Sequence, residues 1–427
     1  MQEVNFVLQQ IGRRDGSAGL FSSHILPNIL LLHKVLDNAS PGTLLNLSKT
    51  CRYAYNAVQE YMSKVYNINK ALRRFFEDPL AFRSMQAITS TLVSGSFALQ
   101  FLGRLYYPES DLDLYCNYDM RKKVGNWIIN QGYTFDPWPW EPEETTFDEA
   151  ANHSAAPLTI GEYSRLHTIC AIYNFKKPNP SHPEEELKVQ VIVACSTPME
   201  VVLQFHSSAS IGPTLITMAI NYWFLACVMN VIAYDCAYSL YPRATFEERI
   251  SMYCASGRPT ERDAAAMGKY QARGFRIIYK WPDSRYDQNV VPITTRWIDD
   301  RYTWTMPLPL DGVTTPRPFN LISSAFSTDP CYFTTWKLSR RYSVRYERAK
   351  SGWGRTEIRT PQPGVCIECD AWSMNGLAYN YVIPAEDEET AKWLKEKARE
   401  VCRSHLARGQ TAEWDREMWE PDVRPLK

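Results

Sequence analysis

The stretch from Leu92 to Cys116 constrains the fold more than any other part of the chain. A short apolar run breaks at Gly95-Ser96 and continues to Leu105 with apolar residues three and four positions apart. This pattern predicts a strand that turns directly into a helix. Because the first amides of a helix have no partner within it, the turn at Gly95-Ser96 is predicted to bind an anion, with the Ser96 hydroxyl beside it.

Two aspartates follow this helix after a turn at Pro108-Glu109-Ser110. The alternation of polar and apolar residues from Asp111 to Tyr115 predicts a half-buried strand with Asp111 and Asp113 on one face. Neighbouring carboxylates repel one another unless a cation lies between them, and oxygen ligands suit Mg²⁺. The predicted anion site and metal site therefore face each other. The alternative is a surface hairpin with solvated aspartates.

The order of strand, Gly-Ser, helix, turn and Asp-x-Asp strand resembles the signature of the nucleotidyltransferase superfamily of the DNA-polymerase-β type. Fourteen residues separate Ser96 from Asp111, slightly more than is usual in that family. Leu102-Gly103-Arg104 also resembles the Leu-Gly-Arg that precedes Asp-x-Asp in tRNA CCA-adding enzymes. The resemblance implies that Gly95 and Ser96 bind a nucleoside triphosphate, that Asp111 and Asp113 bind Mg²⁺, and that a nucleoside monophosphate passes to an acceptor hydroxyl.

The same resemblance implies a third metal carboxylate on a later strand, within the pattern apolar, acidic, apolar, apolar. Residues 166–175 and 187–193 alternate as two strands of a hairpin, and the matching position in the second strand is Gln190. A neutral amide can be a weak metal ligand, but it supplies no charge and cannot act as a base. The catalytic set Asp111, Asp113 and Gln190 therefore predicts nucleotide binding with slow or absent transfer, and leaves open whether the chain is an enzyme.

A helix is predicted from Glu261 to Ala272, with Thr260 as its cap. Lys269, Arg273 and Arg276 lie close together in sequence around its end and could hold a triphosphate. The alternative is a solvated basic helix end, which is favourable in itself because of the helix dipole.

The N-terminal part is predicted to be a poorly ordered lead-in at residues 1–20, followed by a compact helical unit at 21–64. The motif is Leu-Pro at 26–27, an apolar helix, a turn at Pro41-Gly42 and then Leu-Leu-x-Leu-Ser-x-x-Cys-Arg at 44–52. It resembles the F-box, which implies binding to a Skp1-type adaptor of a cullin ubiquitin ligase. Asn28 and Leu30 depart from the family, which often has an acidic residue after the proline. The alternative is a plain helical bundle packed on the next domain.

Composition narrows the classes of partner and compartment. Forty-seven basic and forty-seven acidic residues cancel, so there is no strong case for nucleic acid, and any such contact would have to be local. Eleven cysteines are scattered rather than spaced as a disulfide scaffold, and the N-terminus does not resemble a signal peptide. The chain is therefore interpreted as a reduced, intracellular protein of the cytoplasm or nucleus.

The run from Val201 to Tyr234 contains no Asp, Glu, Lys or Arg. Because Gly212-Pro213 and two asparagines interrupt it, a buried pair of helices is favoured over a membrane span. The region 85–285 is also similar to a group of mushroom-type fungal proteins in which a Phe-His-Ser-Thr-like stretch runs almost directly into Cys-Val-Met-Asn. Here eighteen residues separate the two, so residues 209–226 are interpreted as an insertion or, alternatively, as a native core segment.

The predicted fold class is α+β. A nucleotidyltransferase-like mixed-sheet core is expected at 65–285, after the helical F-box-like unit. A helical and irregular region is expected at 286–427. This last region contains strand-like segments near Tyr332 to Tyr342 and Val365, and an amphipathic helix at 386–408.

Overall fold

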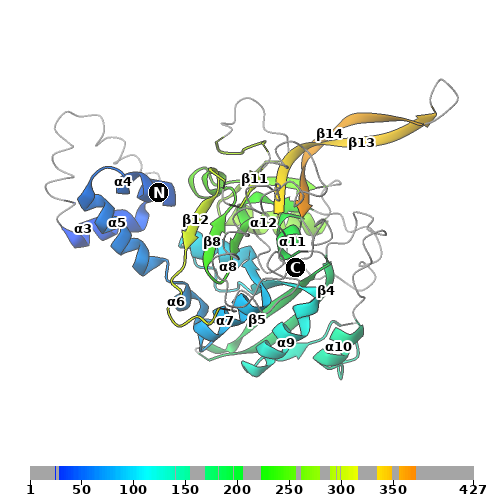
Figure 1. Ribbon diagram of the computed structural model, residues 1–427, viewed down its shortest axis with the longest axis horizontal. Coiled ribbons are helices and arrows are strands. Elements are labelled where there is room, and N and C mark those ends of the chain that lie inside the picture. The colour runs from blue at the N-terminus through cyan, green and yellow to red at the C-terminus, as the bar shows by residue number, and fades with distance from the viewer. Residues whose placement is uncertain are drawn as a thin grey trace, which may run out of the picture.

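The computed structural model describes residues 25, 28–139, 141–153, 169–180, 182–195, 197–204, 223–255, 261–278, 289–294, 296–298, 300–315, 334–348 and 355–371. The predicted lead-in at 1–20, the helix at 386–408 and residues 209–222 of the predicted insertion lie outside this set. Figure 1 shows a helical unit at one end, a mixed α and β body in the centre and a long hairpin that projects from the body.

The N-terminal unit consists of α3 (Ile29–Asn38), α4 (Pro41–Ser48) and α5 (Arg52–Val65). Asn28 caps α3 by accepting from two backbone amides, and Ser40 caps α4, whose first residue is Pro41. The helices enclose their own apolar cluster, which includes Leu32, Leu36, Leu44, Val58 and Tyr61. The predicted compact helical unit is therefore present.

Two residues of the body hold this unit in place. Arg104, with a φ of 51°, ends the helix that starts at Gly95, and its guanidinium donates to the carbonyls of Leu36 and Ala39. The Glu247 carboxylate accepts from the Ser40 hydroxyl at 2.5 Å and from the Gly42 amide at 2.8 Å. The helices α6 (Ile68–Leu72) and α7 (Pro79–Thr89) connect the unit to the body.

The larger sheet has eight strands in the order β12-β8-β7-β1-β2-β5-β4-β3. It is mixed, because β2 and β5 are parallel whereas β1 pairs with β2, and β4 with β5, in antiparallel fashion. In chain order its strands are β1 (Leu92–Ser94), β2 (Leu112–Asn117), β3 (Thr134–Asp136), β4 (Ile169–Asn179), β5 (His182–Ala194), β7 (Asn230–Ile232), β8 (Cys236–Ser239) and β12 (Trp304–Pro307).

Strand β2 is buried on both faces, so the prediction of a half-buried strand is wrong. Leu112 and Leu114 join one apolar cluster with residues of α8 (Gly95–Gly103) and α9 (Arg121–Asn130). Tyr115 joins a second cluster on the opposite face, with residues of α11 (Pro198–Gln204). The alternation of polar and apolar residues did not predict the burial of β2 correctly, because a strand in the middle of a sheet that is covered on both sides has no solvent-exposed face.

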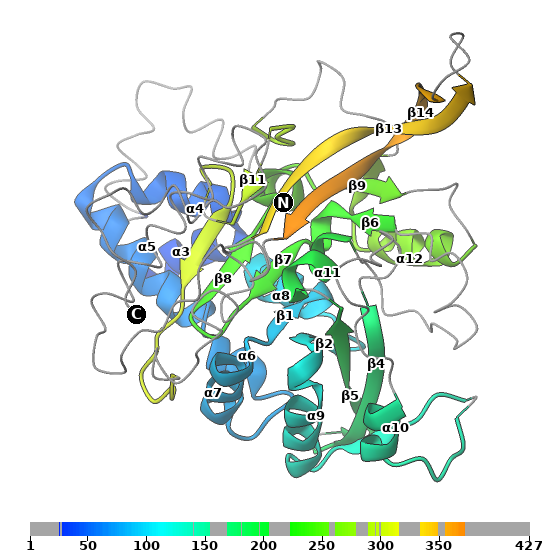
Figure 2. The same ribbon diagram turned by 45° about the vertical axis from the view of Figure 1, so that its right-hand side comes forward.

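A six-stranded sheet lies beside the first, in the order β10-β9-β14-β13-β11, with β6 paired to β9. Helix α11 contacts strands of both sheets, and Figure 2 shows it between them. The elements of this second part are β6 (Trp223–Leu225), β9 (Ile250–Ala255), α12 (Glu261–Ala272), β10 (Arg276–Ile278), β11 (Arg296–Trp297), β13 (Thr334–Arg348) and β14 (Arg355–Ala371).

Shorter helical segments complete the described chain: η2 (Tyr118–Met120), α10 (Phe147–His153), η4 (Ala226–Val228) and a π-helix, η5 (Arg243–Glu247). The expected helix pair across the uncharged run is wrong for the described part of that run. Only α11 is an α-helix there, and residues 223–225 and 230–232 are strands that pair with β9 and β1. No helix among the described residues is long and apolar enough to cross a membrane.

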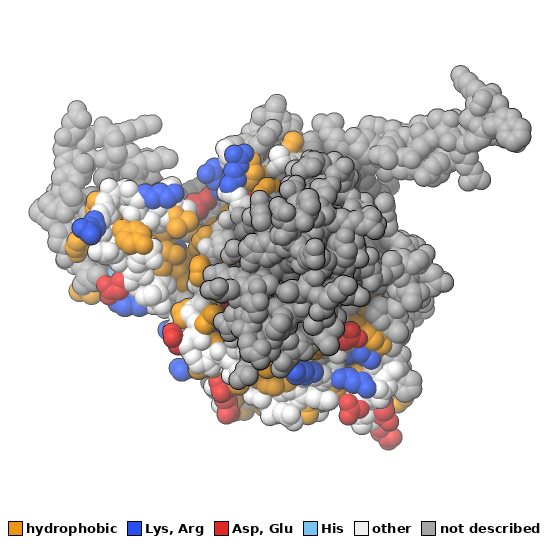
Figure 3. Space-filling model, in the orientation of Figure 1, with side chains coloured by type: hydrophobic (Ala, Val, Ile, Leu, Met, Phe, Trp, Pro, Cys, Tyr) orange, Lys and Arg blue, Asp and Glu red, His pale blue; other side chains and the backbone are white. Residues whose placement is uncertain are grey.

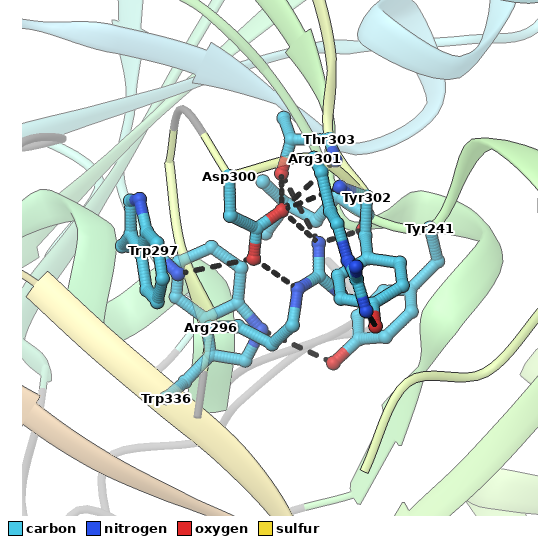
Figure 4. A network of polar contacts seen from close by, with 9 residues as sticks. Tyr241, Arg296, Trp297, Asp300, Arg301, Tyr302, Thr303 and Trp336 are labelled. Atoms are coloured by element: carbon cyan, nitrogen blue, oxygen red, sulfur yellow. Dashed lines mark hydrogen bonds and ion pairs between the residues drawn. The ribbon is translucent and has the colours of Figure 1, made fainter. Parts of the chain in front are cut away.

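A buried ion pair joins the second sheet to the first (Figure 4). The Arg296 guanidinium pairs with both carboxylate oxygens of Asp300 and donates to the Leu240 carbonyl at 2.8 Å. It lies between the rings of Tyr241, Tyr302 and Trp336, with centroid distances of 5.0 to 5.4 Å. This cluster connects elements far apart in sequence and fixes the start of β13.

Two cysteines that the sequence did not pair form a disulfide. Cys170 in β4 and Cys195 after β5 have Cα atoms 5.2 Å apart, because the hairpin register brings them together. The interpretation of a fully reduced chain is therefore wrong for this pair. Cys51, Cys116, Cys227 and Cys236 are free.

Candidate functional site

The turn between β1 and α8 has the form that the sequence predicted. Gly95 has a φ of +70°, and a Cβ atom there would collide with Oδ2 of Asp113. Glycine is therefore required twice, once by the left-handed backbone and once by the approach of the carboxylate. Ser96 lies in the first turn of the nine-residue helix α8, where backbone amides are free to meet an anion.

Asp113 lies at the junction of three strands. The antiparallel pairing places it opposite Ser94 in β1, and the parallel pairing places it opposite Gln190 in β5. The structure thus brings together Gly95, Ser96, Asp113 and Gln190 from three separate stretches of sequence, with Asp111 one residue before β2.

A row of polar residues crosses the sheet at this level. Directly paired residues project from the same face of a sheet, and the register pairs Gln190 with Asn174 and Asn174 with Asp136. The row therefore comprises Ser94, Asp113, Gln190, Asn174 and Asp136, on five adjacent strands. Toward Tyr115 and Ile192 the same face becomes apolar and joins the buried cluster next to α11, whereas toward the opposite end of the strands it contains Lys176 and Lys188.

The carboxylates of the site are held at an electrostatic cost. Asp113 is 8% exposed, and burial, followed by the nearby charge of Asp111, raises its pKa to about 7. Burial also raises the pKa of Asp111, while the positive charges of Lys188, Lys269 and Arg74 oppose that rise. Around neutral pH the nearby positive charges therefore do not fully compensate the two carboxylates.

Two buried acceptor atoms at the site have no hydrogen-bond partner among the residues that the structure describes: Oδ1 of Asp113 and Oε1 of Gln190. The Gln190 amide nitrogen donates to Oδ1 of Asn174 at 2.8 Å, which orients the side chain and leaves its oxygen free. A buried acceptor without a donor costs free energy. Adjacent carboxylate and amide oxygens of this kind fit a hard cation such as Mg²⁺.

The fit is to a single ion rather than to a site rich in acids. Within the part of the chain that the structure describes, no group of three or more His, Cys, Asp or Glu side chains could hold a metal. The residues that could hold such an ion are Asp111 and Asp113, with the Gln190 amide.

Helix α12 brings positive charge to the other side of the turn. Arg273, just after this helix, donates from Nη1 to the Ser96 hydroxyl at 3.3 Å and stacks on the Tyr107 ring at 3.7 Å. Lys269 is exposed, and its positive charge opposes the rise in the pKa of both aspartates. Of the three predicted clamp residues, these two reach the site, whereas Arg276 lies in β10 of the second sheet.

The sequence alone did not identify Tyr270 and Asn174. The Tyr270 hydroxyl lies 3.2 Å from the Ser96 hydroxyl, and its ring is buried. Asn174 is the one polar residue within the run Ile172-Tyr173-Asn174-Phe175, and its place opposite Gln190 follows from the hairpin register. A polar residue inside an apolar strand was the available signal for Asn174, whereas nothing in the sequence marked Tyr270.

Comparison with family models, with curated proteins and with solved structures gave no match to this chain. The functional argument therefore rests on the geometry of the site.

Proposed function

We propose that the chain binds a nucleoside triphosphate together with Mg²⁺, in the manner of the nucleotidyltransferases. The observation that carries the proposal is the pair of buried oxygens on Asp113 and Gln190 that have no partner among the described residues, with the Asp113 carboxylate against Gly95 at the start of α8. Oxygen atoms that can hold a metal ion, next to a helix start that can bind an anion, fit a metal-bound polyphosphate better than either ligand alone.

The roles divide by residue. Gly95 and Ser96 bind phosphate oxygens through backbone amides and the hydroxyl, and Arg273 and Lys269 neutralise the remaining charge. Asp111, Asp113 and the Gln190 oxygen hold Mg²⁺. When bound, the ion neutralises phosphate charge during transfer.

Gln190 limits the chemistry in this proposal. A carboxylate at that position would add a negative charge for a second ion or accept a proton from the attacking hydroxyl, and an amide does neither. We therefore expect nucleotide binding to be measurable, and transfer of a nucleoside monophosphate to an acceptor hydroxyl to be slow or absent.

Titration calorimetry on the full chain tests the proposal, using each of the four ribonucleoside triphosphates with Mg²⁺ or with a chelator. We expect Mg²⁺-dependent binding that Asp111→Asn abolishes, because that change removes charge needed to replace the hydration of the ion. The matched control is Asp119→Asn, an exposed aspartate just after β2. Binding that is independent of Mg²⁺, or equal in both variants, would overturn the proposal.

A second function is favoured by the surface of the helical unit. Leu30 and Leu31 of α3 and Tyr53 and Tyr55 of α5 are 45 to 74% exposed, which is unusual for large apolar side chains on short helices. We propose that this unit acts as an F-box-like docking module for a Skp1-type adaptor, with the nucleotidyltransferase-like body used for recognition.

Co-purification with a Skp1-type adaptor tests this second function. The double variant Leu30→Asp and Leu31→Asp should abolish binding and keep the melting temperature, because both side chains are already exposed. The matched control is Ile293→Asp with Leu310→Asp, which changes two exposed apolar residues outside the unit. Full binding by the first variant would remove the adaptor hypothesis.

A further inference from the structure

The hairpin of β13 and β14 continues well beyond the sheet to which it belongs. The other described strands that pair with it do so near its base, β11 at Thr335 and Trp336 and β9 at Val365. From the pair Tyr342 and Pro361 outward, the two strands pair with each other alone among the described strands, and Figures 1 and 2 both show them projecting from the body. This outer part, residues 342–348 and 355–361, is called the arm below.

The arm is basic in a chain without net charge. It contains four arginines and two glutamates, and two tyrosines lie among them. The backbone register pairs Arg348 directly with Arg355 at the outer end of the arm, and like charges at directly paired positions are unfavourable.

The register sorts these residues onto two faces, because residues two apart on a strand share a face with their direct partners. One face contains Tyr342, Val344, Tyr346 and Arg348, paired with Pro361, Arg359, Glu357 and Arg355. It therefore combines three arginines with both tyrosines. The other face contains Ser343, Arg345 and Glu347, paired with Thr360, Ile358 and Thr356.

We propose that the arm binds single-stranded nucleic acid along the first face. Arginine matches phosphate oxygens through two parallel hydrogen bonds, and tyrosine offers a surface on which a base can stack. Alternating arginine and tyrosine on one ribbon face supplies both contacts at once. The alternative role for the charges is to prevent the exposed strand edges from pairing with other proteins. That role would require neither an excess of arginine nor the tyrosines.

This inference is independent of the proposed nucleotide site, since it rests on a different part of the fold. It also agrees with the neutral composition, which allowed a nucleic-acid contact only if the contact was local. Backbone phosphates and bases occur in both RNA and DNA. The experiment therefore uses both kinds of single strand to distinguish them.

The test is fluorescence anisotropy of the full chain with labelled single-stranded RNA, single-stranded DNA and duplex DNA over a range of salt concentrations. The arm variant is Arg348→Gln, Arg355→Gln and Arg359→Gln. The matched control removes the same charge from exposed residues of the body: Arg73→Gln, Arg243→Gln and Arg301→Gln. A third variant, Tyr342→Ser with Tyr346→Ser, removes the stacking surfaces and keeps the charge.

We expect the wild type and the body control to bind a single strand, and the arm variant to bind at least about tenfold more weakly. The salt dependence of the arm variant should be shallower by about 2 on a log–log scale, because each phosphate contact contributes roughly 0.7. The tyrosine variant should weaken binding with an unchanged salt slope. Asp111→Asn should leave binding intact, which separates this result from the nucleotide site.

Several outcomes would overturn the inference. Equal weakening in the arm variant and the body control would show a diffuse charge effect, and preference for duplex DNA would contradict stacking on the tyrosines. Absence of binding to all three nucleic acids, or binding to vesicles of anionic lipid alone, would assign the arm to another partner. Equal melting temperatures of all variants are required, and they show that the body is intact.

Discussion

Two buried clusters of charge in this molecule are built in opposite ways. Asp300 is 7% exposed, and its carboxylate accepts from Arg296 and from the backbone amides of Trp297, Tyr302 and Thr303. Asp113 is 8% exposed, its closest charged neighbour in sequence is Asp111, and its Oδ1 atom has no partner within the described part of the chain. The two aspartates are equally buried, but only one of them is neutralised.

The difference separates a structural group from a ligand-binding group. A fully paired buried carboxylate holds elements together, as Asp300 does by pairing with Arg296, which itself donates to the Leu240 carbonyl just after β8. A buried carboxylate next to a second one destabilises the free protein, and such groups gather at functional sites, where a ligand makes use of them. The following predictions test whether the two clusters differ in this way.

The largest effect is expected from Asp300→Ala. Removing the carboxylate leaves the Arg296 charge buried and unpaired, which typically costs about 3–5 kcal/mol. The free energy of unfolding in urea measures this loss. Asp311→Ala, at an exposed aspartate, serves as the control and should change stability by less than about 0.5 kcal/mol. A small effect at Asp300 would mean that the ion pair does not join the sheets.

Asp113, whose burial opposes its ionisation, should make the free energy of unfolding depend on pH. In the unfolded chain it ionises near its ordinary pKa, whereas in the folded chain its pKa is about 7. The folded state therefore holds a proton that the unfolded state has lost, so stability falls as pH rises from about 4 to 7 and is constant above that. The fall attributable to this group should be roughly 4 kcal/mol, at about 1.4 kcal/mol per pKa unit over about 3 units.

Urea unfolding of the wild type and of Asp113→Asn at several pH values tests this dependence. The variant should lack that part of the slope and equal or exceed the wild type in stability at pH 8. Saturating Mg²⁺ and nucleotide should restore the stability of the wild type alone, since the ligand needs the ionised form. A slope that persists in the variant would assign the titration to another group.

Gly95→Ala should weaken both the fold and the site. The left-handed backbone costs about 1–2 kcal/mol with any Cβ atom, and the collision with Asp113 adds to that. Gly132→Ala is a matched control, because its φ is +83° and a Cβ there would meet nothing within 4 Å. The excess cost at Gly95, with loss of nucleotide binding, measures the contact with Asp113. Equal costs would mean that the carboxylate moves aside freely.

Local sequence patterns predicted the local parts of this structure. The helix from Glu261 to Ala272 and the Gly-Ser turn depend on neighbouring residues, and both occur where predicted. The family resemblance singled out Gln190 as the third site position, but its direct pairing with Asp113 is known only from the structure, since nothing within a strand fixes its partner.

The failures concern properties that depend on the whole fold. Burial of β2 on both faces depends on α11, about ninety residues away in sequence, and the Cys170–Cys195 bond depends on a hairpin register. Tyr270 and Asn174 reach the site through the same kind of long-range pairing. Patterns of period 2 or 3.6 contain no information about such partners.

The smallest predicted effect comes from Gln190→Asp, which would make the site more acidic. The new carboxylate would lie opposite Asp113, near Asp111, so the free protein should lose about 1 kcal/mol of stability at pH 8 and little at pH 5. Divalent binding should tighten about tenfold, since a charged oxygen replaces a neutral one. Transfer of nucleotide should increase if the acceptor site is intact.

Asn174→Ala, which removes the partner of the Gln190 amide, controls for loss of that hydrogen bond and should weaken binding slightly. If the wild type transfers nucleotides at an ordinary enzymatic rate and Gln190→Asp changes neither binding nor transfer, another acid occupies the third position, and the contrast between the two buried clusters must be drawn with that residue included.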